Sequence, residues 1–259
     1  MNVNRSDGNN NPAAISRRDF LWAGTAGAVG LGLSRAGQAA WADVAGARCD
    51  AVILLWMQGG VSHLDTFDPK PDAPSEIHGP FKAIGTNVPG IQLCEHLPRM
   101  ARIADKIAFI RSMRHGEGAH ERAKSHVLSG CKPLPGVIHP DIGSVVSEEL
   151  GRRGLQLPQK DVAELPSRSV MCAAGERETL ELAKEPEKVR DAYGDSSLGR
   201  KCLLARRLVE AGARFVMVDE GGWDHHFRAF DSLVTRLPQF DRAVSALLAD
   251  LADRGLFDR

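Results

Sequence analysis

The sequence has no excess of charge of either sign, because 33 lysines and arginines balance 33 aspartates and glutamates over 259 residues. A basic patch, which would favour nucleic-acid binding, and a block of like charge, which would favour an interaction tail, are therefore not indicated. Aromatic residues make up 5% of the chain and include a single tyrosine, which argues against a carbohydrate-binding or base-stacking surface.

Cysteine pairs and nucleotide-binding loops are also missing. The five cysteines form no C-x-x-C pair, so neither a disulfide framework nor a zinc knuckle is indicated, and we expect them to be buried small residues. They are Cys49, Cys94, Cys131, Cys172 and Cys202. No Walker loop or dinucleotide-binding glycine fingerprint occurs outside the N-terminal segment.

The N-terminal segment resembles a twin-arginine export signal. SRRDFL at 16–21 begins a mildly apolar segment that reaches residue 33, and Ala-Trp-Ala at 40–42 offers a cleavage site. The glycines of GAVGLG at 27–32 belong to this signal, and the segment is too short and glycine-rich for a membrane span. We expect the twin-arginine translocase to export the chain to the periplasm or cell surface, with no stable membrane span.

Strand and helix patterns alternate over residues 43–259, which we expect to form one domain. Apolar runs predict strands at 49–57, 107–111 and 214–219. Helical spacing predicts helices at 96–104, 117–128, 140–150, 198–211 and 238–254. The stretch 68–90, with five prolines, is expected to be a loop, and 151–187 a loop crossing or a mobile insert. This alternation is typical of an α/β domain with a largely parallel sheet.

Two Gly-Gly motifs follow predicted strands, at the carboxyl ends where such folds bind ligands. After the second motif, in GGWDHH, Asp224 and His226 stand two residues apart and can both reach one divalent cation. The alternative is a turn in which Asp224 caps a helix and the histidines are solvated.

The first motif opens the stretch GGVSHLDTFD. Ser62 lies in a pattern similar to the G-x-S-x-G nucleophile elbow of hydrolases, but Leu64 replaces the final glycine and the chain runs into Pro69 instead of a helix. These two departures argue against an elbow.

The same stretch offers a second metal-binding pattern. His63 and Asp65 form an H-x-D pair, with Thr66 or Ser62 as the nucleophile beside it. The alternative is that Asp65 and Asp68 only hold the turn that precedes the proline.

A third group of reactive residues lies in HGEGAHERAKSHVLSG, residues 115–130, at the start of a predicted helix. The free N–H groups of such a terminus attract anions, and Arg122 and Lys124 have the charge to hold a phosphate or sulfate. His120 and Glu117 are candidates for metal ligation or proton transfer. The alternative is a charged, solvated helix face.

Taken together, these motifs resemble the DUF1501 family, which is distantly similar to sulfatases and the alkaline-phosphatase superfamily. The resemblance extends over most of residues 57–256 and rests on MQGGVSHLDTFDPKP, RSMRHGEGAHERAKSHVLSG, IHPDIGSVVSEELG, AYGDSSLGRKCLLARRLVEAGARFVMVDEGGWDHH and LPQFDRAVSALLADLADRGL. It implies a three-layer α/β/α sandwich with a mostly parallel sheet, and metal-dependent hydrolysis of phosphate or sulfate esters.

The resemblance also assigns roles to residues. Asp224 and His226 match metal ligands best and His63 and Asp65 come next, while His120 falls near the sulfatase nucleophile and Lys124 near its arginine. The predicted site thus has Ser62, Thr66, His120 and Lys124 as catalytic residues, and a divalent metal held by Asp224, His226, His63, Asp65 and Glu117.

Some features depart from the superfamily pattern. Gln58 stands where the first strand usually ends in a metal-binding aspartate, and no cysteine or serine occupies the sulfatase nucleophile position, so formylglycine chemistry is not expected. Family members continue into GEFGR-like and GRDHW-like motifs, which leads us to expect a C-terminally truncated copy. The alternative to an enzyme is an exported binding or cell-surface protein that keeps the fold without catalysis.

Overall fold

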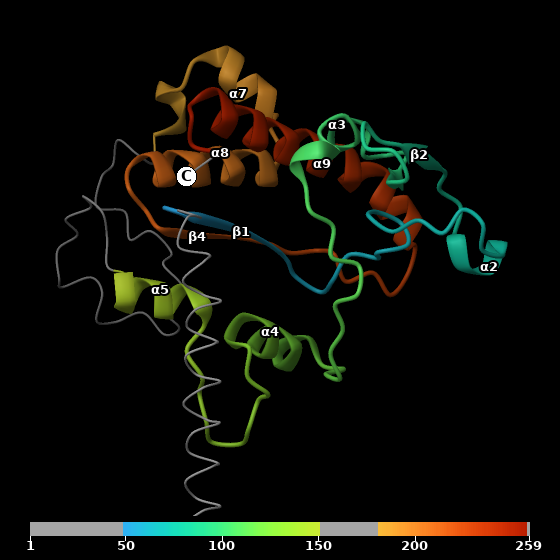
Figure 1. Ribbon diagram of the computed structural model, residues 1–259, viewed down its shortest axis with the longest axis horizontal. Helices are drawn as coiled ribbons and strands as arrows, with labels where there is room; N and C mark the ends of the chain where they lie inside the picture. The colour runs from blue at the N-terminus through green and yellow to red at the C-terminus, as the bar shows by residue number, and fades with distance from the viewer. Residues whose placement is uncertain (1–48, 151–180, 258–259) are drawn as a thin grey trace, which may run out of the picture. The chain divides into compact units, whose positions relative to one another are not determined.

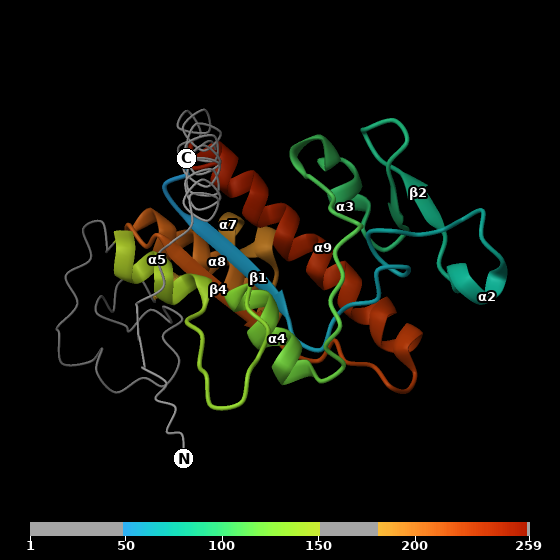
Figure 2. The ribbon, with the colours of Figure 1, turned by 60° about the horizontal axis from the view of Figure 1, so that its bottom comes forward.

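Two strands form the parallel sheet of the computed structural model, which describes residues 49–150 and 181–257. β1 (Val52–Met57) pairs with β4 (Phe215–Glu220), with Val52 opposite Phe215 and Met57 opposite Glu220. Both strands are rich in the β-branched and large apolar residues that favour strands. Because the pair is parallel, the carboxyl ends of both strands lie at one edge (Figures 1 and 2). The prediction of an α/β protein with parallel strands is confirmed at this level.

Helices lie on both sides of these strands (Figure 1). α8 (Ser197–Glu210) lies on one side, and the long α9 (Ala229–Asp253) packs against it. α5 (Ile142–Leu150) lies on the other side, where a Cβ on Gly143 would stand 2.8 Å from the ring of Phe215. α4 (His120–Ser129) lies on the same side as α5. It ends at Gly130, whose φ of 71° is the left-handed conformation that glycine adopts freely.

The predicted loop at 68–90 contains regular structure that the sequence pattern did not indicate. It holds the short helix α2 (Ser75–His78) and the strand β2 (Ala83–Gly85), which pairs antiparallel with β3 (Gln92–Cys94). The remaining elements are α3 (Pro98–Ala101), η2 (Ala104–Lys106), η4 (Leu182–Lys184) and α7 (Glu187–Tyr193). The predicted helix at 96–104 is thus divided into two short pieces.

Two further predictions are wrong. Residues 107–111 form no strand, although Ile107 and Phe109 still pack against the core. The last helix begins at Ala229 instead of residue 238, so Pro238 lies inside it. Leu233 and Leu237 are each only 1% exposed, and burial of these leucines continues the apolar face of the helix through the proline.

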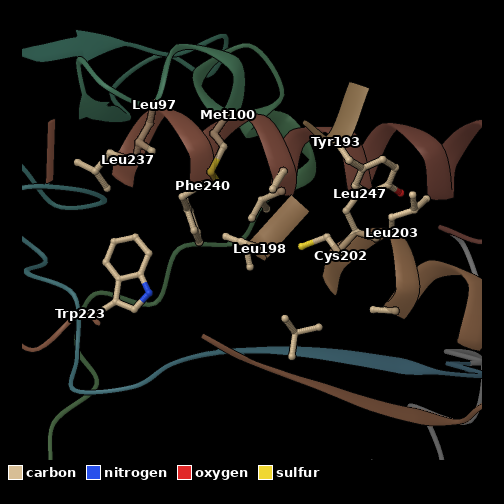
Figure 3. Packing of buried hydrophobic residues seen from close by; sticks show 14 of the residues in the cluster. Leu97, Met100, Tyr193, Leu198, Cys202, Leu203, Trp223, Leu237, Phe240 and Leu247 are labelled. Atoms are coloured by element: carbon tan, nitrogen blue, oxygen red, sulfur yellow. The ribbon is translucent and has the colours of Figure 1, made fainter. Parts of the chain in front are cut away.

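The hydrophobic core fills the space between the helices and the sheet. Figure 3 shows side chains from several elements meeting there: Leu97, Met100, Tyr193, Leu198, Cys202, Leu203, Trp223, Leu237, Phe240 and Leu247. Burial raises the pKa of the Cys94 thiol to about 11 and that of the Cys202 thiol to about 12, so both stay protonated near neutral pH. The expectation of buried cysteines is confirmed for these two.

The expectation does not hold for the remaining described cysteines, since Cys49 and Cys131 are exposed. Cys172, the export signal and most of the expected insert at 151–187 lie outside the described residues. Within the described ranges, no helix combines the length and the apolar character needed to cross a membrane.

A buried ion-pair network joins the helices on the core side of the sheet. The side chain of Arg206 on α8 is fully buried, and its guanidinium lies 2.7 Å from Glu185, 2.6 Å from Glu210 and 2.9 Å from Asp250. Burial alone would raise the pKa of Glu185, but hydrogen bonds from Arg206 and Arg207 outweigh it and hold this pKa below its usual value. The network therefore links α8, α9 and the segment that leads into α7.

We predict that Glu185→Gln lowers the free energy of unfolding by about 2–3 kcal/mol at pH 7, because it leaves the buried guanidinium short of one carboxylate. The depressed pKa means that this contribution is complete above the unfolded value of about 4.3 and is lost as the pH falls through the folded value. Urea unfolding of wild type and variant at pH 7 and pH 3 measures both effects. The exposed Glu187 supplies the control, Glu187→Gln, and equal losses in the two variants would contradict the prediction.

Candidate functional site

The turns after β1 and β4 lie against each other. Main-chain hydrogen bonds continue past the strands, from Gln58 N to the Glu220 carbonyl at 3.0 Å and from Trp223 N to the Gln58 carbonyl at 3.4 Å. Gly59 then approaches Asp224 so closely that a Cβ on the glycine would stand 2.4 Å from the Asp224 Cβ. Its φ of 93° also favours glycine. The Gly-Gly motif after β1 therefore leaves room for the aspartate after β4.

Three side chains converge at this edge: His120, Asp224 and His226. Nε2 of His120 lies 3.1 Å from Asp224 Oδ2, and Nε2 of His226 lies 3.0 Å from Asp224 Oδ1. One ligand atom of each residue lies within 4.8 Å of the others, and all three residues are exposed. His120 is the first residue of α4, whereas Asp224 and His226 belong to the loop between β4 and α9. Residues more than a hundred positions apart in the chain are thus brought together.

This donor set fits a divalent metal ion. Two imidazole nitrogens and one carboxylate are ligands that Zn²⁺ and related ions accept, and catalytic zinc sites commonly use three protein ligands. The two Asp224 oxygens lie at hydrogen-bond distance from the imidazole nitrogens, and a metal ion held by the three residues would replace these contacts. The exposure of the three residues leaves space for further ligands from solvent.

Ion pairs surround the three residues. Lys124, one helical turn after His120, places its ammonium 2.9 Å from Asp219 Oδ2 and so ties α4 to the end of β4. Lys201 of α8 lies 2.6 Å from Glu220 and donates to the Asp219 carbonyl at 2.7 Å. The carboxylates at the end of β4 are therefore paired with lysines, unlike Asp224, which faces imidazoles.

The stretch GGVSHLDTFD is not part of the three-residue group in the described chain. Thr66 is buried and its hydroxyl donates to the Ser62 carbonyl at 2.7 Å, while Ser62 and His63 are exposed. Asp65 is buried, and its Oδ1 has no hydrogen-bond partner among the described residues. The main-chain N–H of Asp68 donates to the His63 carbonyl, and the Asp68 side chain pairs with Lys70 and Arg111. Asp68 therefore holds the turn before Pro69, as the alternative interpretation of this stretch predicted.

Glu117 and Arg122 contact each other instead of Asp224. The Arg122 Nε–Glu117 Oε2 distance is 2.8 Å, and this hydrogen bond lowers the pKa of the Glu117 carboxyl. The predicted metal ligand Glu117 and the predicted anion-binding Arg122 therefore neutralise each other at the base of α4.

The sequence did not reveal how the Asp224 loop is held. Trp223 is 3% exposed and packs edge-on against Phe240, with ring centroids 5.8 Å apart. The guanidinium of Arg236 lies over the indole of Trp223, 4.8 Å from its centroid. A tryptophan directly before an Asp-His-His run was the available signal, since a large buried ring anchors the residues beside it.

We predict that Gly59→Ala destabilises the protein far more than Gly60→Ala. Both glycines have positive φ, at 93° and 83°, so each alanine suffers backbone strain of about 1–2 kcal/mol. Only the alanine at position 59 would also collide with Asp224, because the space around Gly60 is open. Equilibrium unfolding in urea of both variants tests this difference. Equal stabilities would show that the close approach of the two turns is wrong.

Comparison with known proteins agrees with the motifs. The model of the DUF1501 family, described as a protein of unknown function, matches residues 49–176 and 161–259. No curated protein and no solved structure matches the chain. The matched residues include both glycine turns and all three clustered side chains. Since these matches extend over most of the sequence, the chain belongs to the DUF1501 family.

Proposed function

We propose that this protein binds a divalent metal ion through His120, Asp224 and His226 and hydrolyses phosphate or sulfate esters after export by the twin-arginine route. The convergence of these three side chains at the carboxyl ends of β1 and β4 is the observation that supports the proposal. In α/β folds this edge is the usual place for ligands. We further propose that the fold is a three-layer sandwich of the alkaline-phosphatase type.

The residues around the cluster suit an anionic ester. A bound divalent ion would polarise an ester oxygen and activate water, the chemistry that such ions supply in hydrolases. Among the described residues no side chain caps α4, which begins at His120, so its first N–H groups can donate to an anion beside the cluster. Lys124, one turn further along, forms an ion pair with Asp219, and we propose that its remaining ammonium protons orient the anion. Binding and orientation of the anion are the tasks of these groups.

A second candidate function is metal or anion binding without catalysis. Gln58, which follows β1 directly, presents an amide where a further carboxylate ligand would strengthen the site. One exposed metal ion binds an anionic substrate more weakly than two metal ions in one site do. Metal binding without turnover is the outcome that distinguishes this candidate from a hydrolase.

We expect the purified full chain to bind one equivalent of Zn²⁺ or Mn²⁺ and to hydrolyse 4-nitrophenyl phosphate or sulfate. Asp224→Asn should reduce metal affinity at least tenfold, because it removes the carboxylate charge between the two imidazoles. Asp253→Asn, at an exposed position in the last turn of α9, is the matched control and should leave binding unchanged. Calorimetric metal titration and release of 4-nitrophenol provide the two readouts.

The two readouts separate the candidates. Binding with turnover, both lost in Asp224→Asn, supports the hydrolase. Binding without turnover supports the non-catalytic protein. Absence of metal binding in the wild type, or unchanged binding in Asp224→Asn, would refute the proposed metal site.

A further inference from the structure

The loop that carries Asp224 and His226 has no regular structure of its own. It extends from the end of β4 at Glu220 to the start of α9 at Ala229. Metal ligands on such a segment need contacts from neighbouring groups to hold their orientation. The geometry of the candidate metal site therefore depends on what touches this loop.

One side chain, Arg236 of α9, touches every residue of the approach to Asp224. Its Nη2 donates to the Gly221 carbonyl and lies 4.0 Å from Glu220 Oε1. A Cβ on Gly222 would stand 2.8 Å from its Nη1. Its guanidinium also covers the Trp223 ring. Arg236 thus contacts the four residues from Glu220 to Trp223 and ties them to α9.

Ser232, one turn earlier on α9, contacts the loop just after Asp224 in the sequence. Its Oγ lies 2.7 Å from Nε2 of His225, and both side chains are half-buried. His225 stands between the two candidate ligands of the loop. Residues four apart on a helix share a face, so Ser232 and Arg236 reach the loop from the same side and hold it at two points.

The junction between loop and helix is itself strained. Arg228, just before α9, has a φ of 51°, the one positive value among the described residues that are not glycine. Such a conformation is unfavourable for a residue with a side chain and persists where surrounding contacts impose it. The Arg228 side chain itself pairs with Asp231 of α9 at 2.8 Å, while Arg236 and Ser232 contact the loop before it.

We propose that Arg236 and Ser232 are positioning residues, which set the orientation of Asp224 and His226 for the metal without touching it. This inference rests on the proposed metal site. It extends that site from three ligands to a second layer supplied by α9, and it assigns α9 a role beyond the packing of its leucines and Phe240 into the core.

Titration of the metal-free full chain with Co²⁺, followed by visible absorption, tests this inference. Co²⁺ reports both affinity and the geometry of its ligands through the intensity of its bands. Arg236→Met keeps an apolar chain against Trp223 but removes the donor and the charge, and it should weaken Co²⁺ binding by 10–100-fold, the usual effect of outer-shell substitutions. Ser232→Ala should weaken binding by about tenfold and change the band intensities.

Two further variants separate positioning from general stability. Arg236→Lys restores a charge and a donor for the Gly221 carbonyl, so it should recover part of the affinity that Arg236→Met loses. Arg242→Met removes another arginine of α9, which donates to the carbonyls of Asp191 and Ala192, and it should bind Co²⁺ as the wild type does. Circular dichroism of the metal-free proteins identifies any variant that fails to fold, and Ser232→Ala then carries the test.

The outcomes distinguish this inference from the proposed function. A wild type that binds no Co²⁺ refutes the metal site and the positioning role with it. A wild type that binds Co²⁺, with Arg236→Met and Ser232→Ala matching its affinity and spectrum, refutes only the positioning role. Weaker binding with altered spectra in both folded variants supports the inference.

Discussion

Gly59 leaves the space that Asp224 occupies, and this contact lets the turns after β1 and β4 meet at one edge of the parallel pair. Any larger residue at position 59 would push Asp224 away from this edge. The same displacement would move His226, the other candidate ligand on the loop. The absence of a side chain at Gly59 thus determines where the Asp224 carboxylate lies relative to His120.

The site is assembled from three directions. The sheet supplies the edge, α4 supplies His120, and the loop held by α9 supplies Asp224 and His226. Lys124 and Asp219 link α4 to β4, and Arg236 links α9 to the loop, so two ion-pair or hydrogen-bond contacts fix the mutual placement of the elements. The buried network around Arg206 holds α8 and α9 together behind them.

The sequence predicted the parallel strands, most of the helices and the importance of both glycine turns, because apolar periodicity and glycine placement are local signals. It failed at Pro238, where local rules favour a helix start but burial of Leu233 and Leu237 carries the helix across the proline. It also failed at 107–111, whose apolar pattern matches a strand although the segment packs as irregular chain.

The candidate site was predicted in part for the same reason. Asp224 and His226 were recognisable as a pair because their spacing is local. His120 faces this pair, whereas Glu117 contacts Arg122. Both contacts depend on how α4 packs against the ends of the strands, and residue spacing in the sequence does not reveal that packing. The stacking of the Arg236 guanidinium on the Trp223 ring is likewise a tertiary contact, which the local sequence pattern does not indicate.

The proposed metal site holds one divalent cation among His120, Asp224 and His226. Anomalous diffraction at the zinc absorption edge, from crystals grown with Zn²⁺, locates such an ion directly. We expect a single strong peak at this edge of the sheet, about 2.0–2.2 Å from a nitrogen of each histidine and an oxygen of the aspartate. A peak elsewhere, or an ordered His120–Asp224–His226 cluster with no peak in the presence of Zn²⁺, would contradict it.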